Sequence, residues 1–224
     1  MSYNPNIHHR RSIRLKGYDY TREGAYFITI CCQEKKCRFG NIIVDSRENN
    51  AIVGATLAVA PLSVAPHTNL PTEQPPTARD RATARVAPTN VININARMEL
   101  NEFGTIAYNE WMKLTERFPN FESDVFQIMP NHIHGIIVLK DTNTNVGATL
   151  AVVPHAVGEI VGAYKSIVAN ACLKIYKSRN EFMGTLWQRN YHEHIIRSWQ
   201  SYVNISDYII NNPSRWKEDM FFVG

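Results

Sequence analysis

Two strand-like stretches joined by a short turn constrain the fold of this chain more than any other feature. Residues 121–129 and 132–139 each have the length and composition of a strand, and Pro130-Asn131 between them is a turn signal. Two adjacent strands with a tight connection are expected to pair as an antiparallel hairpin. The sequence therefore predicts a sheet with this hairpin in it.

The second strand of the hairpin begins with His132-Ile133-His134. Strand residues two apart point to the same face, so the two imidazoles would project together, and Ile133 would face a dry core. Such a pair can bind a divalent metal or contact a phosphate. A second pair occurs at residues 192–194, but there the residue on the core side would be Glu193, and burying a carboxylate is costly. We therefore favour the first pair as metal ligands over the alternative of packed or surface histidines.

The other elements follow from hydrophobic periodicity and from proline and glycine positions. We expect strands within residues 24–33, 41–45 and 186–197, and helices over residues 100–118, 158–177 and 199–212. Apart from the short 41–45 segment, the order is strand, helix, strand, strand, helix, strand, helix. It predicts an α+β fold with a ferredoxin-like, mostly antiparallel sheet and helices packed on one face.

Length and composition suit one domain with insertions. The chain has 224 residues, no apolar run near the roughly 20 residues that cross a bilayer, and a polar, basic start unlike a signal peptide. Its four cysteines have no paired spacing, so we expect reduced thiols and a cytoplasmic protein.

The net charge of +4 is concentrated at the N-terminus. Arg10, Arg11, Arg14 and Lys16 precede the first acidic residue, which leaves 24 − 4 = 20 basic against 20 acidic residues elsewhere. We interpret residues 1–24 as a basic arm that contacts phosphates and residues 25–224 as the folded domain. A solvated tail is the alternative.

Two segments have the composition of insertions, at about residues 46–94 and 141–157. The first is rich in Ala, Thr, Pro and Val, and both contain nearly the same nonapeptide, VGATLAVAP at 53–61 and VGATLAVVP at 146–154. A repeat this short and this isolated is not a solenoid unit. We interpret both copies as passengers in loops.

The last predicted helix places Tyr208 and Asn212 one turn apart on a polar stripe, beside an apolar face that includes Ile205 and Ile209. A phenol there is suited to be a nucleophile, and an amide oxygen to be a third metal ligand. Taken alone, a tyrosine in such a position is more often a packed residue with a bonded hydroxyl.

A third cluster alternates aromatic and cationic side chains. It contains Trp187, Arg189 and Tyr191, and Arg197 follows. This pattern is typical of surfaces that stack unpaired bases and contact phosphates, although an edge strand with core aromatics would look similar.

These features together resemble the REP-associated tyrosine transposases, members of the HUH single-tyrosine superfamily. The matching segments are RRSIRLKGYDY (10–20), GAYFITICCQ (24–33), MELNEFG (98–104), MPNHIHGIIVL (129–139), VGAYKS (161–166), LWQRNYHEHIIR (186–197) and DYIINNPSRW (207–216). They cover most of the chain outside the insertions. One departure is His192, where many relatives carry an aromatic residue.

The resemblance implies a metal site at His132 and His134, with Asn212 as third ligand for Mg²⁺ or Mn²⁺ and Tyr208 as nucleophile. It also implies an HUH-endonuclease type of domain that cleaves and rejoins single-stranded DNA beside a REP-like hairpin through a covalent 5′-phosphotyrosine. The cationic and aromatic side chains expected to hold this DNA are Arg10, Arg11, Arg14, Lys165, Trp187, Arg189, Tyr191 and Arg197.

Two other functions are compatible with the same residues. An inactive copy would bind hairpin DNA without cleaving it, and a metal hydrolase unrelated to DNA would use the histidine pair and a water molecule. The resemblance spans monomers and homodimers, so the oligomeric state stays open.

Overall fold

The structure is a computed structural model that describes residue 15 and residues 17–44, 96–141 and 154–223. The predicted DNA contacts Arg10, Arg11 and Arg14 lie outside these residues, as do the whole of the first predicted insertion and residues 142–153 of the second.

A four-stranded antiparallel sheet forms the centre of the molecule, with the strand order β4-β5-β1-β6. The strands are β1 (Gly24–Cys31), β4 (Phe121–Ile128), β5 (His132–Leu139) and β6 (His192–Ile196). With the two crossover helices, the chain order β1, helix, β4, β5, helix, β6 is the ferredoxin-like arrangement. The predicted fold class is therefore confirmed, including the hairpin of β4 and β5.

A separate two-stranded hairpin precedes the first crossover helix. It pairs β2 (Gly40–Val44) with β3 (Ala96–Leu100), and a short 3-10 turn, η1 (Gln33–Lys35), lies between β1 and β2. The sequence had indicated β2 but not β3. Val44 at the end of β2 is the register partner of Ala96 at the start of β3, so the two ends of the connecting segment lie side by side.

The helices begin and end where local signals place them. They are α2 (Glu102–Met112), α3 (Leu114–Arg117), α4 (Val157–Ser178), α5 (Trp199–Asn211) and the 3-10 helix η2 (Pro213–Glu218). The side chains of Asn101 and Ser198 cap α2 and α5 by accepting hydrogen bonds from backbone N–H groups of the first turn. Pro213 follows α5 and begins η2.

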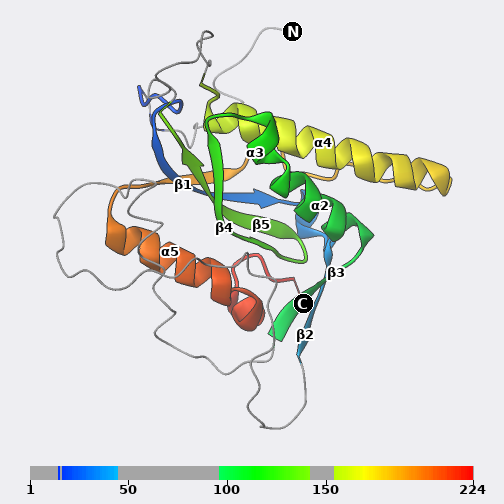
Figure 1. Cartoon of the computed structure of the whole chain (residues 1–224). Coiled ribbons are helices and arrows are strands. Elements are labelled where there is room, and N and C mark those ends of the chain that lie inside the picture. The colour runs from blue at the N-terminus through cyan, green and yellow to red at the C-terminus, as the bar shows by residue number, and fades with distance from the viewer. Residues whose placement is uncertain (1–14, 16, 45–95, 142–153, 224) are drawn as a thin grey trace, which may run out of the picture.

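Helices cover both faces of the sheet, which differs from the expected single helical face (Figure 1). On one face α2 and α4 pack on Ile133 and Ile137, and on the other α5 packs on Ile136 and Val138. The physical reason is that β5 is apolar on both sides along its second half, so each side needs a cover. The two histidines share the face that α5 covers, whereas Ile133 is fully buried on the other face, as predicted.

No helix in the described residues is long and apolar enough to span a membrane.

Candidate active site

The structure brings the histidine pair, Tyr208 and Asn212 together. His132 and His134 begin β5, and α5 lies across this face of the sheet so that Tyr208 Oη is 3.1 Å from His134 Nε2. Asn212 caps the end of the same helix and is buried. Tyr208 is 38 % exposed, so its side chain is reachable from solvent. The amphipathic pattern of α5 accounts for this placement, because its apolar side packs on the sheet beside the imidazoles.

The tautomer of His132 is fixed by its neighbour Asn131. The Asn131 amide nitrogen donates to the carbonyls of Lys35 (2.9 Å) and Phe221 (2.8 Å), so its oxygen Oδ1 must face the ring. That oxygen lies 2.8 Å from His132 Nδ1, which must therefore carry the proton. The lone pair of His132 is thus on Nε2, which points into the site.

His134 is held in a similar way by Thr29. The Thr29 hydroxyl lies 2.8 Å from His134 Nδ1, and both side chains are buried. Its Nε2 is the ring atom that faces Tyr208. Holding one imidazole nitrogen so that the other is presented is the usual arrangement around metal-binding histidines.

Two buried atoms at the site have no hydrogen-bond partner, His132 Nε2 and Asn212 Oδ1. Orphaned buried lone pairs are costly, and a cation satisfies both at once. Two imidazole nitrogens with amide and carboxylate oxygens form a donor set that suits Mg²⁺, Mn²⁺ or Zn²⁺. The residues present therefore fit a divalent metal.

The sequence did not indicate Asp219, which joins this site. Its Oδ2 accepts hydrogen bonds from Asn212 Nδ2 (2.7 Å) and Tyr208 Oη (3.2 Å) and lies 4.0 Å from His134 Nε2. Potential ligand atoms of His132, His134 and Asp219 all lie within 4.8 Å of one another. The chain returns to the site because η2 turns it back after α5. The one available signal was a carboxylate seven residues after Asn212, which is too common to be informative.

Burial controls the charges of these groups. It lowers the pKa of both imidazoles, so they are neutral and their lone pairs are available near pH 7. It also raises the pKa of Tyr208, and the neighbouring Asp219 carboxylate raises it further. Burial acts to raise the pKa of Asp219, but His134 and Asn212 outweigh it and keep that pKa below its usual value. The site thus pairs a protonated phenol with an ionised carboxylate.

Two of the residues predicted to contact DNA make contacts within the protein. Trp187 is 6 % exposed, its ring packs against Phe39 and Tyr164, and its Nε1 donates to the Lys165 carbonyl. Lys165 Nζ in turn donates to the carbonyls of residues 188 (2.7 Å) and 189 (3.0 Å). These bonds tie the 186–189 segment to α4, so Trp187 is buried with its indole N–H donated to backbone, and Lys165 Nζ is donated to backbone carbonyls.

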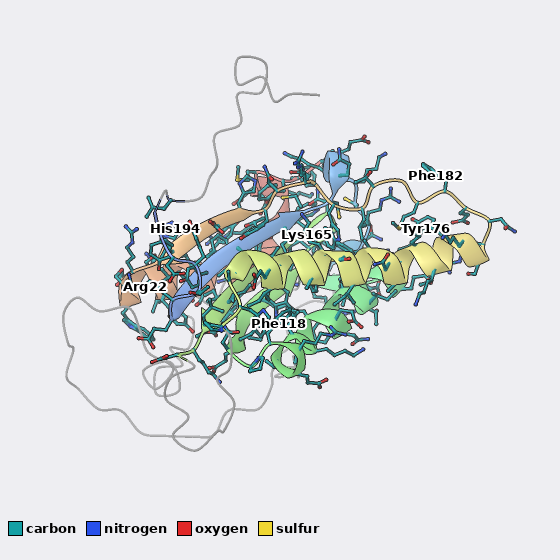
Figure 2. The ribbon with its side chains drawn as sticks, turned by 90° about the horizontal axis from the view of Figure 1, so that it is seen from above. Arg22, Phe118, Lys165, Tyr176, Phe182 and His194 are labelled. Carbon is teal, nitrogen blue, oxygen red and sulfur yellow. The ribbon has the colours of Figure 1, made fainter. Side chains whose placement is uncertain are left out.

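The remaining cationic and aromatic predictions divide by exposure. Arg189 and Arg197 are exposed, whereas Tyr191 is half-buried against the core on the α2–α4 side. The second histidine pair is also exposed, on β6, with His192 and His194 on the face that carries the first pair. Figure 2 labels His194 on β6 and Lys165 on α4. The expectation that the cost of burying Glu193 would disfavour this orientation is wrong: Glu193 takes the core side of the edge strand β6, and its carboxylate oxygens are buried there.

The fold and the site define a class of protein. It is a ferredoxin-like domain in which a histidine pair on a strand lies beside a tyrosine and an asparagine on a helix. An uncharacterised protein of Haemophilus influenzae is 33 % identical over 231 residues, covering 99 % of this chain and 97 % of that protein. A second Haemophilus influenzae protein, described as "Putative REP-associated tyrosine transposase", is 29 % identical over 115 residues, or 51 % of this chain and 58 % of that protein.

Among solved structures, one described as a REP-associated tyrosine transposase bound to a REP hairpin matches with a TM-score of 0.44 and 14 % identity, over 91 % of this chain and 74 % of that one. No family model matches the sequence. Over half of its length the chain is therefore similar to a putative REP-associated tyrosine transposase, the family that its sequence segments resemble.

Proposed function

We propose that this protein is a DNA transposase that binds hairpin DNA and cleaves and rejoins an adjacent single strand through a covalent link to Tyr208. The observation that carries the proposal is the contact of Tyr208 Oη with His134 Nε2 and Asp219 Oδ2, in a site with two orphaned buried lone pairs. The similarity to a protein described as a putative REP-associated tyrosine transposase supports the choice of DNA as substrate.

Tyr208 is the proposed nucleophile. Its Oη attacks the scissile phosphorus, the bond from phosphorus to the 3′ oxygen breaks, and the products are a 5′-phosphotyrosine and a free 3′ hydroxyl. Another 3′ hydroxyl reverses the step with no external energy, because the phosphodiester bond is exchanged rather than hydrolysed. Because the Tyr208 side chain is partly exposed, a flexible single strand of DNA can reach it.

Asp219 is the proposed acceptor of the phenolic proton. The phenol of Tyr208 is protonated near neutral pH because its pKa is raised, so attack requires a base. Asp219 Oδ2 lies 3.2 Å from Tyr208 Oη and belongs to a carboxyl group whose pKa is lowered, so it is ionised and in reach. The same proton is then available to the departing 3′ oxygen.

The metal would be held by His132 Nε2, His134 Nε2 and the orphaned Oδ1 of Asn212, with Asp219 in reach. A bound Mg²⁺ or Mn²⁺ supplies Lewis-acid polarisation of the scissile phosphate. Asn131 and Thr29 orient the two imidazoles toward it.

The DNA partner is proposed to be a hairpin with single-stranded flanks, as in REP elements. Arg10, Arg11 and Arg14 of the basic arm remain candidates for phosphate contacts, and the exposed Arg189 and Arg197 are candidates on the folded domain.

Adduct formation tests the proposal. Purified protein is incubated with Mn²⁺ and labelled hairpins from the DNA that flanks its own gene, and adducts are resolved on a denaturing gel. Tyr208→Phe should bind the hairpin without forming an adduct. Tyr202→Phe is the matched control, because this tyrosine lies on the same helix but its hydroxyl donates to Asp124, and it should form the adduct. His132→Ala should abolish metal-dependent cleavage.

The two alternative functions predict different results on the denaturing gel. Binding of DNA by the unmodified protein with no adduct at any divalent metal would indicate an inactive hairpin-binding protein. Cleavage that survives in Tyr208→Phe, with no protein–DNA adduct, would indicate a metal hydrolase.

A further inference from the structure

The second histidine pair lies in line with the first across the sheet. Thr29 on β1 is the register partner of His134 on β5 and also of His192 on β6. The next position of β1 on the same face, Phe27, is the partner of His194. Register partners in antiparallel strands point to the same face, so both imidazoles of β6 emerge on the face that carries the candidate active site.

The β6 pair differs from the β5 pair in its exposure. His192 and His194 are exposed on the edge strand, whereas His132 and His134 are at most 1 % exposed. Glu193 between them is the partner of Ile28, a core residue on the opposite face. The β6 imidazoles therefore point away from the α2–α4 core and lie on the face of the sheet that carries the candidate active site.

The two pairs are also connected through the C-terminal segment. The ring of Phe221 lies 4.7 Å from the His132 ring and 6.2 Å from the His192 ring, measured between centroids. In the described part of the chain, neither β6 imidazole has a hydrogen-bond or ion-pair partner for its ring nitrogens. Two donors thus face solvent beside the site.

We propose that His192 and His194 form a phosphate-binding pair that holds the backbone of a nucleotide next to the scissile phosphate. This inference rests on the proposed function. An imidazole N–H donates to a phosphate oxygen whether the ring is neutral or charged. His192 lies two strand spacings from His134, roughly 10 Å, a span that a neighbouring nucleotide of a strand crossing the sheet can bridge.

A second metal site is a poorer occupant for this pair. Among the described residues, the only group of three or more His, Cys, Asp or Glu side chains placed to hold a metal consists of His132, His134 and Asp219. The β6 imidazoles have no third ligand of these types, whereas phosphate oxygens need only donors.

Phosphate scanning tests the pair. Tyr208→Phe is the parent protein, so that binding is measured without cleavage, with Mg²⁺ present. The probe is a labelled hairpin from the DNA flanking the gene, in which one phosphate at a time is replaced by a neutral methylphosphonate. The same scan is run on the parent carrying His192→Ala and His194→Ala. A control carries His155→Ala, a partly exposed histidine that packs on Phe118 of the α2–α4 core, on the opposite side of the sheet.

In the parent, one or two positions beside the scissile phosphate should each lose about tenfold in affinity on neutralisation, as expected for a hydrogen bond to a charged group. In the double alanine variant that loss should disappear while the other positions keep theirs, and glutamine at both positions should restore part of it. His155→Ala should leave the pattern unchanged. A pattern identical in the parent and the double variant overturns this inference alone. Failure of the parent to bind any hairpin overturns the proposed function and this inference with it.

Discussion

Replacing Thr29 by valine should weaken divalent-metal binding by roughly 10- to 100-fold, although Thr29 is not itself a proposed ligand. Valine has nearly the shape of threonine, so the substitution removes the hydroxyl and little else. The Thr29 hydroxyl is 2.8 Å from His134 Nδ1, and it orients the ring that presents Nε2 to the site.

The magnitude follows from burial. Thr29 is 3 % exposed and His134 is 1 % exposed, so water has no ready access to replace the lost hydroxyl. Leaving a buried polar atom without its partner costs about 1–3 kcal/mol. A tenfold to hundredfold loss of affinity corresponds to about 1.4–2.7 kcal/mol, which is the same range.

The assay is titration with Mn²⁺, followed by calorimetry or by the electron paramagnetic resonance of free Mn²⁺. Thr29→Ser should keep most of the affinity because it retains the hydroxyl. Thr21→Val is the control, since the hydroxyl of Thr21 is exposed and bonds to Asp19. The reasoning is refuted if Thr29→Val folds normally and binds Mn²⁺ as tightly as the unmodified protein.

Two further predictions concern stability. Gly135→Ala should lower the free energy of unfolding by about 1–3 kcal/mol, because the added Cβ would lie 2.7 Å from the Trp111 indole. Gly162→Ala is the control and should not destabilise the protein, because the added Cβ would have no atom within 4 Å. Urea denaturation of both variants measures the difference, and equal unfolding midpoints would contradict the prediction. Stability should also fall as the pH drops below about 6.5, because His132 and His134 have folded-state pKa values below the unfolded value, so the unfolded chain takes up protons first. The expected slope is up to about 1.4 kcal/mol per pH unit for each histidine, and a curve as steep in the His132→Gln, His134→Gln variant would contradict it.

The sequence predicted the parts of the site that periodicity determines. The alternation in β5 separates the imidazoles from Ile133, and the helical stripe in α5 separates Tyr208 and Asn212 from the apolar face. These patterns fix which way a side chain points before any tertiary contact is known. That the sheet and the helix would meet at this pair required the register of the whole fold, which no local pattern contains.

Local sequence patterns did not predict the positions of Asp219, Trp187 and the second histidine pair. Asp219 reaches the site because η2 turns the chain back after α5, and a single acidic letter does not reveal that path. Trp187 has the composition of a base-stacking residue but is buried by α4, which only packing decides. The orientation of His192 depended on the register of β6 against β1, and register follows from the whole fold rather than from local sequence.

The identity of the residue joined to DNA tests the central claim most directly. The protein is trapped on its hairpin substrate with Mn²⁺, digested with protease and nuclease, and the modified peptide is sequenced by mass spectrometry. The account predicts one nucleotide-bearing peptide, with the 5′-phosphate on Tyr208. A phosphotyrosine elsewhere, for example at the half-buried Tyr191, or cleaved DNA with no modified peptide, would contradict it.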